Sequence, residues 1–167
     1  MAPRTVQIPD MTLWSQSIGG LIINFGQIEF QTLRWLQLLG GESGAISARR
    51  HKLSRRINAV TGLISCSRLP AEKQVRAHEL WTEISELSRT RNRIAHNPIC
   101  VGLHPQTGKP VLSVIDLQQM EPMGENALEP LDHTQIASTA LRASEIAREL
   151  GELIEPLDEQ PAVERET

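Results

Sequence analysis

Residues 80–98 read LWTEISELSRTRNRIAHNP and carry the clearest helical pattern of the chain together with a dense group of basic side chains. Apolar positions from Leu80 to Ile94 recur at steps of four and three residues, which is typical of one face of an α-helix. This helix is expected to end at Asn97, because Pro98 disfavours helical geometry in the residue before it. Arg91 occupies a position where the pattern predicts an apolar residue. A guanidinium is costly to bury without a partner, so we expect Arg91 to line a cleft or an interface.

His96 belongs to a different face of the same helix. Five residues turn an α-helix by about 140° beyond a full turn, so one helix cannot easily direct Arg91 and His96 at one small ligand. His96 falls instead near Arg89, and within about 60° of Arg93. Two copies of the helix, packed about a two-fold axis, could share such a site. Fraying of the helix before Pro98 could also turn His96 round.

The rest of the sequence predicts an all-α protein, a four-helix up-down bundle with a short β-hairpin between helices three and four. The helices are expected over about 12–39, from 45 or 47 to 65, over 71–96 and over 132–154, and the hairpin strands over 99–103 and 111–115. Gly40–Gly44 is expected to end the first helix as a loop, and residues 116–131 to connect the hairpin to the last helix. We expect one domain over 12–155, a loose lead-in over 1–11 and a disordered acidic tail over 156–167.

Two polar or amphipathic features of the first helix bear on its packing. Glu29 interrupts an apolar run, and it either pairs with an arginine of the third helix or faces solvent; the sequence leaves both alternatives open. Trp14 and Trp35 are expected at the margin of the buried side.

The composition is that of an ordinary globular protein, with 40% hydrophobic, 22% charged and 3% aromatic residues. So few aromatic residues favour a core of Leu, Ile, Val and Ala between packed helices. Cys66 and Cys100 lack a CxxC spacing and are expected to be reduced thiols. The N-terminus lacks an apolar signal region, and polar residues interrupt every apolar run. We therefore expect a cytoplasmic protein without a membrane partner.

The charge of the chain is unevenly distributed. The net charge is −3, yet between Ser47 and Arg93 basic residues outnumber acidic ones by seven. Such asymmetry can produce a local basic surface on an acidic protein. The start of the second helix contributes five of these residues, Arg49, Arg50, Lys52, Arg55 and Arg56. They predict a surface that contacts the phosphate backbone of RNA, and the alternative is a solvated helix face.

The segment RNRIAH over residues 91–96 resembles the Arg-x4–6-His motif of the HEPN superfamily (higher eukaryotes and prokaryotes nucleotide-binding), including the polar residue after the arginine. Arg89 satisfies the longer spacing, so the sequence leaves open which arginine belongs to the motif. The resemblance implies a helical homodimer that cleaves RNA without a metal, as a toxin or as a defence or stress effector. In that hypothesis His96 is the acid or base and Arg91 holds the phosphate. Asn92, Arg93 and Arg89 would support them.

Three further observations limit this hypothesis. The toxin subgroup of the superfamily carries a Tyr two residues after the His, whereas this chain has Pro98 there and no Tyr at all. That argues against a toxin silenced by modification of this tyrosine, although an antitoxin or regulatory protein stays a candidate partner. The alternative function is a non-catalytic HEPN-like module that binds a nucleotide, RNA or a partner protein. No cofactor motif is found, and no metal is expected: His96, Cys100 and His104 have a suggestive spacing, but Pro98 breaks the helix that would align them.

Overall fold

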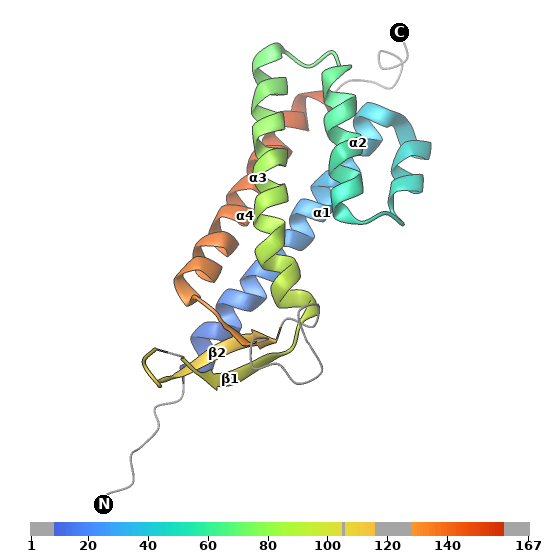
Figure 1. The fold of residues 1–167 in the computed structure, drawn as a ribbon. Helices are drawn as coiled ribbons and strands as arrows, with labels where there is room; N and C mark the ends of the chain where they lie inside the picture. Colours follow the sequence, from blue (N-terminus) through green and yellow to red (C-terminus); the bar gives the residue numbers. More distant parts are fainter. Residues whose placement is uncertain (1–8, 105, 116–127, 159–167) are drawn as a thin grey trace, which may run out of the picture.

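A computed structural model describes residues 9–104, 106–115 and 128–158 (Figure 1). In these residues the chain forms four helices and one antiparallel three-stranded sheet. The elements in chain order are α1 (Met11–Ala48), α2 (Leu53–Ser65), α3 (Ala71–His96), β1 (Ile99–Leu103), β2 (Pro110–Ile115), β3 (Leu128–Pro130) and α4 (His133–Asp158). The prediction of a mostly helical protein with a hairpin between its last two long helices is therefore confirmed.

The second half of the chain follows the sequence-based prediction closely. Helix α3 has the predicted bounds, and β1 pairs with β2 in an antiparallel register that joins Ile99 to Val114. Strand β3 was not predicted; it adds to the free edge of β2. Helix α4 continues to Asp158, so the prediction of a tail from residue 156 is wrong at its start. The predictions for 1–8, 116–127 and 159–167 lie outside the described residues.

The boundary between the first two helices differs from the prediction. Only Gly41 leaves the helical conformation, with φ 75°, a left-handed value that glycine adopts without steric cost. Helical turns then resume and continue to Ala48, and α2 begins at Leu53 rather than near residue 45. The segment after Gly41 turns the chain back, so that α1 and α2 point in similar directions (Figure 1). The up-down order of the helices is consequently not confirmed.

Two tryptophans lie at the centre of the core. Trp35 of α1 and Trp81 of α3 are fully buried, with ring centroids 6.1 Å apart and planes at 87°. The indole N–H of Trp35 donates to the Leu150 carbonyl of α4 at 3.1 Å. The prediction that Trp35 lies at the margin of its helix is therefore wrong, because α3 and α4 close around it. This contact fixes α1, α3 and α4 relative to one another.

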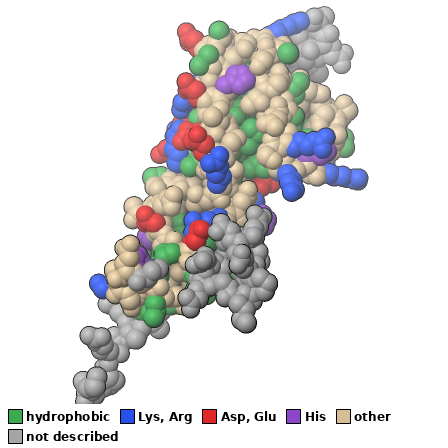
Figure 2. All heavy atoms as spheres, in the orientation of Figure 1, with side chains coloured by type: hydrophobic (Ala, Val, Ile, Leu, Met, Phe, Trp, Pro, Cys, Tyr) green, Lys and Arg blue, Asp and Glu red, His purple; other side chains and the backbone are tan. Residues whose placement is uncertain are grey.

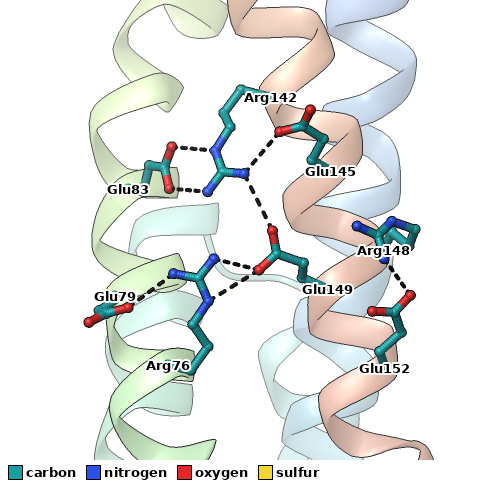
Figure 3. A network of polar contacts seen from close by, with 8 residues as sticks. All are labelled: Arg76, Glu79, Glu83, Arg142, Glu145, Arg148, Glu149 and Glu152. Atoms are coloured by element: carbon teal, nitrogen blue, oxygen red, sulfur yellow. Dashed lines mark hydrogen bonds and ion pairs between the residues drawn. The ribbon is translucent and has the colours of Figure 1, made fainter.

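An ion-pair network joins α3 to α4 on the outside of the core (Figure 3). Arg142 of α4 donates to both carboxylate oxygens of Glu83 at 2.7 and 2.8 Å, a two-point contact. Arg76 of α3 in turn donates to Glu149 of α4. The hydrogen bond from Arg142 lowers the pKa of Glu83, and the hydrogen bond from Arg76 lowers the pKa of Glu149. The two carboxylates are thus held in their charged form across the helix pair.

Candidate functional site

Three charged side chains from three helices meet between α1, α2 and α3, and we call them the Glu29 cluster. Glu29 accepts a hydrogen bond from Arg56 Nη2 at 2.8 Å on one oxygen and from Arg91 Nη2 at 3.0 Å on the other. The side chains of Arg56, Glu29 and Arg91 are 8%, 31% and 23% exposed. Of the two alternatives for Glu29, the structure shows the pairing with an arginine of the third helix.

The Glu29 cluster contains two positive charges and one negative charge. One carboxylate therefore neutralises only half of the positive charge in a partly dehydrated site. The Nε atoms of Arg56 and Arg91 are buried and have no hydrogen-bond partner among the described residues. The cluster thus keeps one positive charge in excess, at a place where electrostatic interactions are strengthened because water is partly excluded. The arginine at an apolar position of α3 is thus explained by a carboxylate on α1.

His96 lies at the other face of α3, in its last turn. Its side chain is exposed and makes no hydrogen bond or ion pair with any described residue. Arg89 is exposed on the same face, also without a described partner. A single chain therefore does not bring Arg91 and His96 to one point, as their separation along the helix predicts.

The two residues predicted to support the site make contacts of their own. Asn92 accepts a hydrogen bond from Arg91 Nη1 at 3.0 Å, which fixes the orientation of that guanidinium. Arg93 forms an ion pair of 2.6 Å with Glu129 of β3 and so ties the end of α3 to the sheet. Asn97 donates to the Arg93 carbonyl at 2.9 Å and closes the last helical turn. The segment that carries His96 is thus anchored on both sides.

The basic run at the start of α2 divides into two groups. The side chains of Arg49, Arg50, Lys52 and Arg55 are exposed and have no side-chain partner among the described residues. Figure 2 shows basic side chains gathered at this end of α2. Arg56 is buried in the Glu29 cluster instead, because the helix turns its inner face toward α1 there. The structure therefore places four of the five residues predicted to contact RNA on the surface.

A groove between α2 and α3 was not found from the sequence. It has a volume of about 590 Å³ and is lined mainly by hydroxyl and amide side chains. Ser65 and His78 face each other across it, with Oγ and Nε2 3.2 Å apart. Trp81 also lines the groove, and its buried indole N–H has no acceptor among the described residues. Ser and Thr recurring at steps of four and three on facing helices was the sequence signal.

Comparison with family models, with curated proteins and with solved structures finds no match to this chain. Among the described residues, no three His, Cys, Asp or Glu side chains are grouped so as to hold a metal ion. No helix of the described segments has the length and hydrophobicity that crossing a membrane requires. The Glu29 cluster and the exposed His96 are therefore the features from which a function can be inferred.

Proposed function

We propose that the protein is a metal-independent endoribonuclease that acts as a homodimer, with Arg91 and His96 of both copies around one RNA phosphate. The observation that supports the proposal is that α3 carries both an exposed His96 without a described partner and, on another face, the Arg91 guanidinium that Glu29 and Asn92 hold in place. A general acid or base must be reachable, whereas a phosphate-binding group must be fixed. Both conditions hold on α3, on different faces.

The chemistry uses the nucleophile that RNA itself contains. The 2′-oxygen attacks the adjacent phosphorus, and the imidazole of one His96 takes its proton. The bond from phosphorus to the 5′-oxygen breaks, and the protonated imidazole of the second His96 gives its proton to the leaving oxygen. Arg91 stabilises the charge that grows on the phosphoryl oxygens. The products are a 2′,3′-cyclic phosphate end and a 5′-hydroxyl end, so atoms and protons balance.

Two features of the single chain support a homodimer. One acid and one base are needed, whereas each chain supplies one exposed imidazole at the end of α3. Arg91 and His96 also lie on faces of α3 that a single substrate phosphate cannot contact together. A two-fold axis close to the end of α3 supplies the second imidazole and the opposite orientation. The bundle then serves as the support on which each half of the site is held.

The surface formed by Arg49, Arg50, Lys52 and Arg55 would contact the RNA backbone beyond the cleaved phosphate. Contacts of this kind release counterions, so binding weakens steeply as salt is raised. Arg55 and Arg56 form a natural comparison, because they are neighbours of identical chemistry and differ in burial. Arg55→Gln should weaken RNA binding and leave stability unchanged. Arg56→Gln should chiefly lower stability.

The proposal is tested by RNA cleavage in excess EDTA, comparing the wild-type protein with His96→Ala and Arg91→Ala. We expect cleavage with cyclic phosphate ends, and a loss of about 100-fold or more without the imidazole. His96→Ala removes an exposed side chain and should keep the stability of the protein, whereas Arg91→Ala also disturbs the Glu29 cluster. His104→Ala, which removes a histidine from the hairpin turn, is the matched control and should retain activity.

A folded, dimeric protein that cleaves none of tRNA, mRNA or rRNA would overturn the proposal of a nuclease.

The α2–α3 groove favours a second candidate function, a non-catalytic module that binds an uncharged polar ligand such as a nucleoside. Its hydroxyl and amide side chains offer several hydrogen-bond donors and acceptors. Nucleoside binding that is lost in Thr82→Val, without any cleavage, would support this candidate.

A further inference from the structure

Helix α1 carries an apolar stripe that no part of the described chain covers. Ile23 is 66% exposed and Phe30, seven residues later, is 56% exposed. Gly19 and Gly26 alternate with them, and a Cβ built at either glycine would have no atom within 4 Å. Glycine inside a helix is destabilising relative to alanine. Packing within one chain therefore gives no reason for either glycine, and we call these four residues the α1 face.

The spacing and charge of the α1 face are those of a helix–helix contact. Positions 19, 23, 26 and 30 follow steps of four, three and four, the narrow seam along which two helices pack. Between Thr12 and Gln37, α1 has only two charged residues, Glu29 and Arg34. Glu29 is paired with two arginines, and Arg34 donates to Gln31 at 3.3 Å. A surface without free charges is typical of the centre of an interface.

We propose that the α1 face binds a second copy of this chain, with the two α1 helices antiparallel. In this arrangement Ile23 packs on Gly26 of the second copy, and Phe30 packs on its Gly19. Both pairs share one midpoint, between Asn24 and Phe25, so a single two-fold axis there satisfies them together. Each large side chain meets a glycine, and the face is complementary to itself, as a two-fold interface requires.

The same register accounts for a hollow at the start of α1. This hollow has a volume of about 470 Å³ and is lined by Met11, Thr12, Ser15 and Gln16. Gln16 and Leu33 have the same midpoint as the two glycine pairs, so Leu33 of the second copy faces the hollow. Leu33 is half-buried in one chain and sits on the same side of the helix as Gly26. The second copy would therefore cover this hollow with its Leu33 side chain.

The size of the contact sets the expected affinity. From Gln16 to Leu33 the stripe is about 26 Å long, and a helix is about 10–12 Å wide. This area is well below the roughly 800 Å² per partner of a standard stable interface. We therefore expect a weak dimer whose population depends on concentration.

The dimer also deepens the proposed function, and this step rests on it. Helices α1 and α3 are antiparallel, since Trp35 contacts Trp81 and Glu29 contacts Arg91. His96 lies five residues beyond Arg91, about 7.5 Å further along α3. Trp81 and Arg91 are ten residues apart on α3, whereas their partners Trp35 and Glu29 are six apart on α1, so five further residues of α3 correspond to about three of α1. The level of His96 therefore lies near Gly26 of α1, within about two residues of the two-fold axis, which is where the composite site needs the axis to pass along α3.

The first test is disulfide cross-linking in a Cys66→Ser, Cys100→Ser background. Ile23→Cys combined with Gly26→Cys should form an intermolecular disulfide upon mild oxidation, because the two positions face each other across the axis. Val75→Cys, at a residue of α3 that is 59% exposed, is the control for collisions and should cross-link far less. Equal cross-linking of both variants would overturn the register.

The second test exchanges the large and the small residue of the pair Ile23 and Gly26, and analytical ultracentrifugation measures the dissociation constant of each variant. Gly26→Ile places Ile against Ile, and Ile23→Gly removes the large side chain. Each should raise the dissociation constant about tenfold or more. Ile23→Gly with Gly26→Ile restores one large residue opposite one glycine and should restore the dimer. Circular dichroism checks that all variants stay helical.

The outcomes separate the interface from the nuclease. A wild-type protein that is monomeric at its highest soluble concentration, or a double exchange no better than the single variants, would overturn the α1 interface. RNA cleavage by such a monomer would overturn both the interface and the composite site, whereas RNA cleavage by a dimer that lacks the cross-link between positions 23 and 26 would overturn the α1 interface alone. A dimer with the expected cross-link that cleaves no RNA would support the interface and overturn the nuclease.

Discussion

Removing the carboxylate of the Glu29 cluster is expected to lower the free energy of unfolding by an amount that follows from the burial of the cluster. The change is Glu29→Met, which removes the carboxylate and keeps a side chain of similar length. Arg56, with a side chain only 8% exposed, then loses its described ion-pair partner. Two guanidinium groups would remain between α1, α2 and α3 without the negative charge that separates them.

The magnitude follows from the burial of the three side chains. Removing one partner of a buried ion pair costs about 3–5 kcal/mol, because the remaining charge is left uncompensated. Glu29 and Arg91 are 31% and 23% exposed, so water relieves part of this penalty. We expect a loss of about 2–3 kcal/mol in the free energy of unfolding. For a chain of this size, this corresponds to a fall of roughly 4–12 °C in Tm.

The loss in free energy of unfolding can be measured by urea unfolding followed by tryptophan fluorescence, since Trp35 and Trp81 are fully buried in the folded protein. The informative control is Glu29→Met combined with Arg56→Met. Replacing a buried ion pair by apolar side chains is often neutral or stabilising, so the double variant should recover most of the loss. The reasoning is refuted if Glu29→Met costs less than about 0.5 kcal/mol, or if the double variant is less stable than the single one.

Two further expectations concern the frame of the molecule. Because their folded pKa values are lowered, Glu83 and Glu149 stabilise the protein above their unfolded pKa, near 4.5, and this contribution is lost as the pH falls through the folded pKa values. The urea concentration at the midpoint of unfolding should therefore decrease less between about pH 6 and pH 3 in Arg142→Met than in the wild type. An equal decrease in both proteins would contradict the conclusion that Arg142 lowers the pKa of Glu83. Gly41→Ala should destabilise by about 1 kcal/mol or more, since φ is 75° there, whereas Gly62→Ala in α2 should stabilise by about 0.4–1 kcal/mol because its Cβ meets open space. Thermal unfolding compares the two variants, and a Gly41→Ala protein as stable as Gly62→Ala would show that residue 41 can adopt another conformation.

Local signals explain which parts of the fold could be predicted. The bounds of α3 follow from Pro70 at its start and Asn97-Pro98 at its end, which act within one or two residues. The start of α2 was predicted too early, because a run of glycines has several ways to break a helix and only Gly41 does so. The burial of Trp35 was missed for a different reason. Trp81 and Leu150 enclose it from positions distant in sequence, and the periodicity of α1 alone does not report them.

The Glu29 cluster could have been predicted from the sequence if the charged residues on the buried sides of the three helices had been considered together. Arg91 was recognised as a charge at an apolar position, and Glu29 as a charge inside an apolar run. Arg56 was grouped with Arg55 as a surface residue, although it lies four residues before the buried Val60 and hence on the inner face of α2. Each of three helices therefore carries one charged residue on its buried side. Because such charges are costly unless paired, two arginines and one glutamate at these positions indicate one another across 27 and 62 residues of sequence. The same reasoning does not reach His96, which is exposed and has no partner among the described residues that would indicate its position.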